Sequence, residues 1–113
     1  MIKIYHNNRC SKSRCALELL EASKQPFEIV YYLENTPTVK ELKQLIKLLG
    51  IKPLELIRTN ESIWKENFKS SEFSDDELIK IMVKHPKLIE RPIIVNGNKA
   101  VIGRPAENIF DIL

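Results

Sequence analysis

The sequence has few of the residues that build metal sites and disulfide frameworks. Two cysteines and two histidines occur among its 113 residues. They form no grouping with the spacing of a structural zinc site, so we expect no metal. Thiols stay reduced inside cells, so two cysteines indicate a reactive or a packing role rather than a structural crosslink.

Long apolar runs are also missing. Ile93-Ile94-Val95 is among the longest, and about 20 apolar residues are needed to span a bilayer. Lys3, His6 and Arg9 interrupt any apolar segment near the N-terminus, so we expect no secretory leader. These two absences predict a cytoplasmic protein without a membrane partner.

Charge of one sign is not concentrated anywhere in the chain. The 18 basic residues are offset by 15 acidic ones, which leaves a formal net charge of +3. Lys and Glu intermix along the expected helices, as at Lys40-Glu41 and Lys65-Glu66, which is typical of solvated helix faces. Nucleic-acid binders gather basic residues on one face or in a tail, so we expect no nucleic-acid partner. The slight positive balance favours a small anionic substrate.

Hydrophobic periodicity and turn residues predict four strands and a series of helices. The strands are expected at residues 2–5, 27–33, 91–95 and 100–102. The third is entered through Pro92, and a hairpin at Asn96-Gly97 joins it to the fourth. The helices are expected at residues 11–22, 38–49, 53–57, 63–68, 74–84 and 106–113. Ser11 or Ser13 is the expected N-cap of the first helix.

Three further local signals fix the ends of the middle helices. Thr38 with Glu41, and Ser74 with Glu77, have the spacing of a capping box. Gly50 is placed as a helix C-cap. We interpret these helices as an insertion that could form a wall on one side of a site.

The order of these elements is β-α-β, a run of helices, then β-β-α. Without the middle helices, this order predicts an α/β fold with a mixed four-stranded sheet covered by helices. A chain of 113 residues is large enough for one hydrophobic core but not for two. We therefore expect a single domain over residues 1–113, with a helical insertion at about 36–88.

Cys10 lies where the first strand gives way to the first helix. Its sulfur would face the free N–H groups of the first helical turn, where the helix dipole favours a negative group. Arg9, Lys12 and Arg14 add positive charge. Such surroundings lower a cysteine pKa from about 8.5 to roughly 3.5–7.5 and favour the nucleophilic thiolate. The alternative, a small buried cysteine, fits less well, because the loop has no aliphatic neighbours.

Cys15 follows Cys10 by about one helical turn and precedes Ala16-Leu17. The Cys-x4-Cys spacing differs from the Cys-x-x-Cys of dithiol oxidoreductases, in which a cysteine would replace Ser13. Packing against the sheet is the expected role of Cys15. A role as resolving thiol, through a disulfide with Cys10, is the alternative.

The remaining histidines and the tryptophan have simpler expected roles. His6, at the end of the first strand, either stabilises the thiolate and shuttles protons or orders the loop through a hydrogen bond. His85, before Pro86, is expected to be an exposed residue at a helix end. Trp64 is expected to be a partly buried anchor of the inserted helices.

Several short segments, taken in order, resemble the ArsC family, the glutaredoxin-linked arsenate reductases of bacteria and their close paralogues. The segments are Tyr5-His6-Asn7, Cys10-Ser11-Lys12-Ser13-Arg14, Tyr32-Leu33-Glu34, Leu56-Ile57-Arg58, Glu90-Arg91-Pro92-Ile93 and Gly103-Arg104-Pro105. One motif alone would be weak, but the ordered set extends over nearly the whole chain. The resemblance implies a thioredoxin-like fold with a helical insertion.

The resemblance also implies a mechanism. Cys10 would attack arsenate and form a thiol–arsenate adduct, with glutathione as co-substrate, no bound cofactor, and glutaredoxin as the partner that clears the mixed disulfide. The protein would act as a monomer, and Pro92 would be a cis proline. The supporting residues around Cys10 would be His6, Asn7, Ser13 and Arg14.

The family's three oxyanion-binding arginines match Arg58, Arg91 and Arg104. The forked donors of arginine suit a tetrahedral oxyanion such as arsenate. Alone, Arg58 would more simply cap the last carbonyls of a helix. Arg91 and Arg104 each precede a proline at a strand boundary, on either side of one hairpin. This placement predicts that they meet at one end of the sheet.

Two departures from the common family pattern leave the substrate open. Asn8 occupies a position that is often proline, and Cys15 is not part of the usual motif. The alternative to an arsenate reductase is an ArsC-like thiol oxidoreductase acting on another thiol or oxyanion. Spx-type regulators, which share the fold and bind RNA polymerase, fit less well, because Ser13 removes their Cys-x-x-Cys switch.

Overall fold

The computed structural model describes residues 2–113, which contain a mixed four-stranded sheet. The strands are β1 (Ile2–Tyr5), β2 (Phe27–Val30), β3 (Ile93–Asn96) and β4 (Lys99–Ile102), in the order β2-β1-β3-β4. β1 is parallel to β2 and antiparallel to β3, and β3 is antiparallel to β4. The predicted mixed sheet is confirmed.

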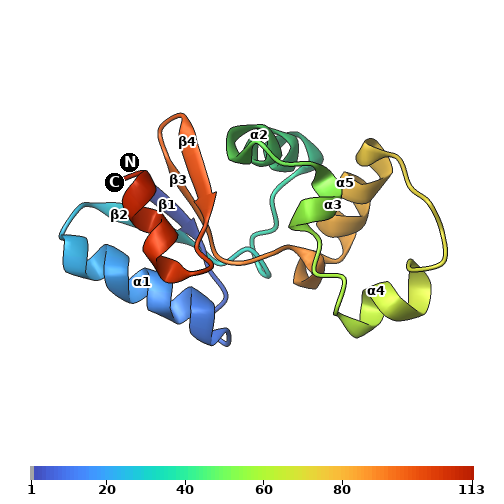
Figure 1. The fold of residues 1–113 in the computed structure, drawn as a ribbon, viewed down its shortest axis with the longest axis horizontal. Helices are drawn as coiled ribbons and strands as arrows, with labels where there is room; N and C mark the ends of the chain where they lie inside the picture. Colours follow the sequence, from blue (N-terminus) through green and yellow to red (C-terminus); the bar gives the residue numbers. More distant parts are fainter. Residues whose placement is uncertain (1) are drawn as a thin grey trace. The chain divides into compact units, whose positions relative to one another are not determined.

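The sheet belongs to a compact unit formed by residues 2–35 and 91–113. Helix α1 (Ser11–Ser23) and the C-terminal 3-10 helix η2 (Ala106–Asp111) pack against each other in this unit (Figure 1). The core contains buried side chains from β1, β3, α1 and η2, and from the residue that follows η2. They are Ile2, Ile4, Ala16, Leu20, Ile94, Ala106, Ile109 and Ile112. This core fixes where α1 begins relative to the end of β1.

Residues 36–90 form a second compact unit made of helices. Its elements are α2 (Val39–Leu49), α3 (Pro53–Leu56), α4 (Ser62–Asn67), α5 (Asp75–Lys84) and the 3-10 helix η1 (Pro86–Leu88). α5 contacts both α2 and α3, and an antiparallel bridge joins Ile57 to Ile89. The expectation that the whole chain folds as one domain stays a prediction.

The predicted helix caps of the second unit are confirmed. The Thr38 hydroxyl accepts the N–H of Glu41, whose carboxylate accepts the N–H of Thr38 in return. Ser74 and Glu77 form the same reciprocal pair. Gly50 ends α2 with φ of 69°, a left-handed conformation in which a side chain is unfavourable.

An aromatic cluster corrects two expectations within the helical unit. The Trp64 side chain is 8% exposed, so it is buried rather than partly buried. Its ring lies 5.7 Å from that of Phe68 and 6.3 Å from that of Phe73. His85, expected to be exposed, is half-buried, with its ring 5.7 Å from Phe68. Aromatic contacts therefore cover the helix end that sequence reasoning left open to solvent.

Four features of the first unit differ from those predicted. β3 begins at Ile93 and not at residue 91. β2 ends at Val30 and not at residue 33. The hairpin is confirmed, but its two-residue loop is Gly97-Asn98, because Asn96 pairs with Lys99. The C-terminal segment is a 3-10 helix that ends at Asp111 and not at residue 113. Each shift is small because turn residues mark a region more accurately than they mark a single residue.

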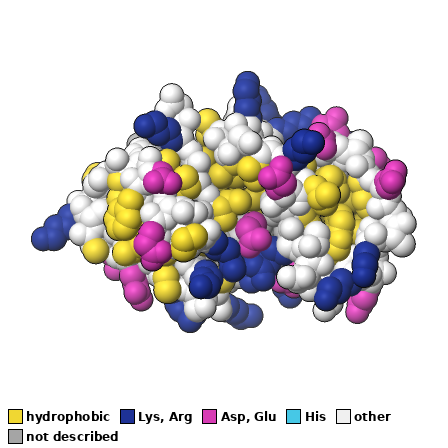
Figure 2. Space-filling model, in the orientation of Figure 1, with side chains coloured by type: hydrophobic (Ala, Val, Ile, Leu, Met, Phe, Trp, Pro, Cys, Tyr) yellow, Lys and Arg dark blue, Asp and Glu magenta, His cyan; other side chains and the backbone are white. Residues whose placement is uncertain are grey.

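Both signs of charge are spread over each unit. Figure 2 shows Lys and Arg side chains interspersed with Asp and Glu on the face drawn. Within residues 2–113, no helix has the length and apolar character needed to cross a membrane. The same residues contain no cluster of three or more His, Cys, Asp or Glu side chains arranged to hold a metal ion.

Candidate active site

Cys10 is the N-cap of α1, and its sulfur is partly exposed. Its backbone is extended, with φ of −99° and ψ of 121°, and its carbonyl accepts the first helical bond from Arg14 N–H, at 3.0 Å. Neither Ser11 nor Ser13 caps the helix, so that prediction is wrong. The backbone N–H groups of Lys12 and Ser13 hydrogen-bond to the Cys10 sulfur. The sulfur thus occupies the position in which a helix N-terminus stabilises an anion.

Two arginines from the ends of the β3–β4 hairpin converge on this sulfur. Nη2 of Arg104 lies 3.5 Å from Cys10 Sγ, and Nε of Arg104 donates to the Arg91 carbonyl oxygen at 2.8 Å. The predicted meeting of Arg91 and Arg104 at one end of the sheet is therefore confirmed. The Arg91–Pro92 peptide is cis, as the resemblance implied, and so is Arg104–Pro105.

Close packing beside Arg104 fixes the backbone that carries it. Gly103 N–H donates to the Pro92 carbonyl oxygen at 2.9 Å. A Cβ atom at Gly103 would lie 2.9 Å from side-chain atoms of both Ile94 and Pro92, and 3.3 Å from Ala16 Cβ. Only a residue without a side chain fits this approach of the hairpin to α1. The Arg104 guanidinium is consequently presented to Cys10 from a tightly packed backbone.

The surroundings of the Cys10 sulfur lower its pKa. Burial of the sulfur alone would raise the pKa of Cys10 above its ordinary value of 9.0. The Ser13 N–H, the Arg91 guanidinium and the Lys12 N–H outweigh burial and lower that pKa to about 7. About half of Cys10 is then thiolate at neutral pH, against about 1% for an ordinary pKa of 9.0.

A buried polar pair holds the loop between β1 and α1. The Ser13 hydroxyl is fully buried, lies 2.6 Å from Nδ1 of His6, and accepts the N–H of Asn7 at 3.1 Å. Because that oxygen already accepts one hydrogen bond, its own proton is free to donate to Nδ1. Burial lowers the pKa of His6, and the positive charge of Arg14 lowers it further. His6 therefore orders the loop through its hydrogen bond with Ser13, the second of the two roles considered for it.

Asn7 and Arg14 add hydrogen bonds that shape the same loop. The Asn7 carbonyl accepts the N–H of Cys10 at 3.0 Å, and the Asn7 side chain accepts the N–H of Arg9 at 3.0 Å. Nη1 of Arg14 donates to the Asn8 carbonyl oxygen at 3.0 Å. These bonds fix the path of the chain directly before Cys10. Ser13 was expected as one of two possible helix caps. Its link to His6 was not predicted, because seven residues separate the two.

Arg58 lies in the helical unit and binds two carboxylates there. Its Nε donates to Glu61 at 3.3 Å, and its Nη1 donates to Glu90 at 3.1 Å. The simpler role considered for Arg58, capping carbonyls at a helix end, is not the one observed. Both carboxylates hold the guanidinium in a fixed orientation, and its role as an oxyanion ligand stays a prediction.

The family is decided by comparison with known proteins. The model of the ArsC family matches residues 5–112. The chain belongs to the ArsC family.

Individual ArsC relatives match over nearly the full length of this chain. An Escherichia coli K12 protein, named the uncharacterized protein YfgD, is 46% identical over 99% of this chain and 96% of its own length. An arsenate reductase of Neisseria meningitidis serogroup A is 41% identical over 99% of this chain and 97% of its own. The solved structure of an arsenate reductase from Vibrio cholerae superposes with a TM-score of 0.94. That structure is 46% identical over 99% of this chain and 97% of its own. The thioredoxin-like fold expected from the resemblance is thereby confirmed.

Cys15 departs from its expected place in this ArsC chain. The packing role predicted for Cys15 is wrong, because its side chain is exposed. The buried face of α1 consists of Ser13, Ala16 and Leu20, and at about 100° per residue Cys15 falls on the opposite side of the helix. By the same geometry, Cys15 lies about 140° around the helix from Cys10. A resolving role for Cys15 stays a prediction.

Proposed function

We propose that this ArsC chain is an arsenate reductase in which Cys10 is the nucleophile. The contact between the Arg104 guanidinium and the Cys10 sulfur, 3.5 Å long, is the observation that carries the proposal. An arginine beside a sulfur with a lowered pKa serves two purposes. It favours the thiolate, and it offers donors to an incoming oxyanion. The names of the relatives point to the same substrate.

The first step forms a bond between sulfur and arsenic. The Cys10 thiolate attacks dihydrogen arsenate, the S–As bond forms, and one As–O bond breaks. The departing oxygen leaves as water with both protons of the substrate, and arsenic stays As(V). Arg91, Arg104 and Arg58 are the proposed ligands of the arsenate oxygens, since forked donors stabilise the charge that builds up there. Their positive charges offset the repulsion between thiolate and oxyanion.

The second step transfers two electrons to arsenic. The thiolate of glutathione attacks the Cys10 sulfur, an S–S bond forms, and the S–As bond breaks with its electron pair remaining on arsenic. Arsenite, As(III), leaves, and Cys10 is held in a mixed disulfide. A glutaredoxin thiolate then attacks the glutathione sulfur of that disulfide and restores Cys10. We propose that the protein acts as a monomer in the cytoplasm, where the glutathione pool is reduced.

The proposal is tested by arsenate-dependent oxidation of NADPH. Purified protein is mixed with glutathione, glutaredoxin, glutathione reductase and NADPH, and the rate is measured with and without arsenate. We expect turnover in the native chain and, within about twofold, in Cys15→Ser, because the exposed Cys15 takes no part in the proposed steps.

Two results would count against this scheme. A native chain that oxidises NADPH with a disulfide substrate but not with arsenate would be an ArsC-like thiol oxidoreductase. A large loss in Cys15→Ser would make Cys15 a resolving thiol and remove the direct attack of glutathione on the Cys10 sulfur.

A further inference from the structure

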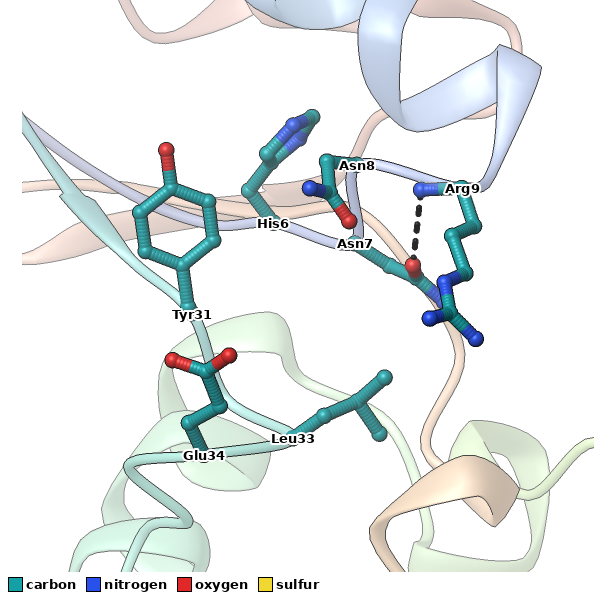
Figure 3. A pocket seen from close by; sticks show the side chains of 7 residues that line it. All are labelled: His6, Asn7, Asn8, Arg9, Tyr31, Leu33 and Glu34. Carbon is teal, nitrogen blue, oxygen red and sulfur yellow. Dashed lines mark hydrogen bonds between the residues drawn. The ribbon is translucent and has the colours of Figure 1, made fainter.

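A cavity of about 460 Å³ opens beside the loop that carries Cys10. Residues 6–9 form one wall, and Tyr31, Leu33 and Glu34 form the other (Figure 3). The first wall follows β1 and the second follows β2. Because β1 and β2 are parallel, the segments after them meet at the same edge of the sheet, which is a common place for a ligand in α/β folds.

The residues of the first wall and Cys10 are consecutive in one short, hydrogen-bonded loop. The first wall ends at Arg9, one residue before Cys10. Cys10 N–H donates to the carbonyl oxygen of Asn7, which is itself part of this wall. Cys10 itself is not part of the lining, so the cavity adjoins the loop that leads to the reacting residue, and a bound peptide would have to extend past Arg9 to reach the sulfur.

Opposite charges stand at two sides of this cavity. Figure 3 shows Arg9 and Glu34 on opposite sides. Both charged side chains are exposed, and neither forms an ion pair with any other residue of the range 2–113. A separated cation and anion of this kind match a ligand that carries both a carboxylate and an ammonium group.

The volume and the apolar surface of the cavity restrict further which class of ligand fits it. A volume of about 460 Å³ lies within the range of sites that hold drug-sized ligands and exceeds what one amino acid needs. Tyr31 and Leu33, 41% and 38% exposed, contribute apolar surface to the same wall as Glu34. These features suit a short peptide, whose methylene groups contact the apolar surface while its charged ends reach Arg9 and Glu34.

We propose that this cavity binds the thiol co-substrate, a short peptide thiol that carries both a carboxylate and an ammonium group, as glutathione does. Arg9 binds a carboxylate of the peptide, and Glu34 binds its ammonium group. The inference rests on the proposed function, since it concerns the second step of the reaction. Bound there, the peptide sulfur attacks Cys10 Sγ and forms the S–S bond. The S–As bond breaks, its electron pair reduces As(V) to As(III), and the thiol proton ends on an arsenite oxygen.

The decisive variant is Glu34→Gln. Glutathione has a net negative charge at neutral pH, so long-range electrostatics predicts that removing a carboxylate nearby improves its binding. Our assignment predicts the reverse. We expect the KM for glutathione to rise about fivefold or more, through loss of a charge-assisted contact. The KM for 2-mercaptoethanol, a neutral thiol, is expected to stay unchanged. Glu18→Gln, at an exposed position of α1, is the matched control.

Arg9→Gln tests the other proposed contact, between the guanidinium and a carboxylate of the peptide. We expect its KM for glutathione to rise by a similar factor, and its KM for 2-mercaptoethanol to stay at the native value. Lys99→Gln removes an exposed positive charge from β4 and serves as its control. Equal KM values for glutathione in the native chain and in both cavity variants would overturn the assignment, even if arsenate turnover is normal.

A binding measurement separates this inference from the proposed function. S-methylglutathione cannot react, so its affinity for the native chain and for Glu34→Gln is measured by NMR titration without arsenate. We expect shifts at residues 6–9 and 31–34, and about fivefold weaker binding in the variant. Such binding without any arsenate turnover would overturn the proposed reductase and support the peptide site. Arsenate turnover, together with S-methylglutathione binding that is equally tight in the native chain and in Glu34→Gln, would support the proposed reductase and overturn the peptide site.

Discussion

Cys10→Ser is expected to reduce arsenate turnover by about 10³-fold or more. The variant keeps a side chain of similar size at the N-terminus of α1, but it replaces a thiolate by a hydroxyl that stays protonated at neutral pH. The hydroxyl is a weak nucleophile at arsenic, and it cannot form the mixed disulfide from which glutaredoxin regenerates the enzyme. The measurement is kcat/KM for arsenate in the NADPH-coupled assay.

Cys15→Ser is the matched control for this loss, because it removes the other thiol of the same helix. Circular dichroism and the midpoint of urea unfolding are compared for both variants, to show that neither loses its fold. Turnover in Cys10→Ser within about tenfold of the native rate would mean that the sulfur of Cys10 does not react with arsenate.

Arg104→Ala is expected to lower kcat/KM for arsenate by about 10²–10³-fold, the usual effect of removing one preorganised oxyanion donor. The guanidinium contacts the Cys10 sulfur through Nη2 and is held by the Arg91 carbonyl through Nε. Arg104→Lys keeps the charge but cannot make both contacts. We therefore expect Arg104→Lys to recover only part of the activity lost in Arg104→Ala.

The control for charge alone is Lys99→Gln, an exposed position in β4 of the same hairpin. We expect its kcat/KM to stay within about twofold of the native value, because a distant exposed charge is screened by salt. An equal loss in Lys99→Gln and Arg104→Ala would reduce the role of Arg104 to general electrostatic attraction. Full activity in Arg104→Lys would show that the positive charge is sufficient and that the forked donors of the guanidinium are not needed.

The fold was predictable where short-range signals determine local structure. The reciprocal hydrogen bonds of Thr38 with Glu41 need residues only three positions apart, so the sequence alone located that cap. Asn96-Gly97 marked the hairpin within one residue of its loop, because glycine is the residue that adopts positive φ without strain. The proline after Arg91 and the proline after Arg104 located both ends of the hairpin.

The parts that sequence reasoning missed depend on contacts between distant segments or on orientation around a helix. The face of α1 that carries Cys15 is determined by how the helix packs on the sheet, and the aliphatic neighbours of Cys15 pointed to the wrong face. The Ser13–His6 pair joins a helix to the end of a strand. The cavity with Arg9 and Glu34 exists because β1 and β2 are neighbours in the sheet. Neither residue has a local signal that distinguishes it from other surface charges.

The pKa of Cys10 tests the central claim most directly. The thiolate of the Cys15→Ser variant is followed by its ultraviolet absorbance, or by the rate of iodoacetamide alkylation, across pH 5 to 10. The helix N–H groups and Arg91 lower the pKa of Cys10 to about 7, so thiolate absorbance and alkylation rate should rise with a midpoint near pH 7. A midpoint between about 8.5 and 9.0, the range of ordinary values for cysteine, would contradict the claim that this site holds its sulfur ionised for attack on an oxyanion.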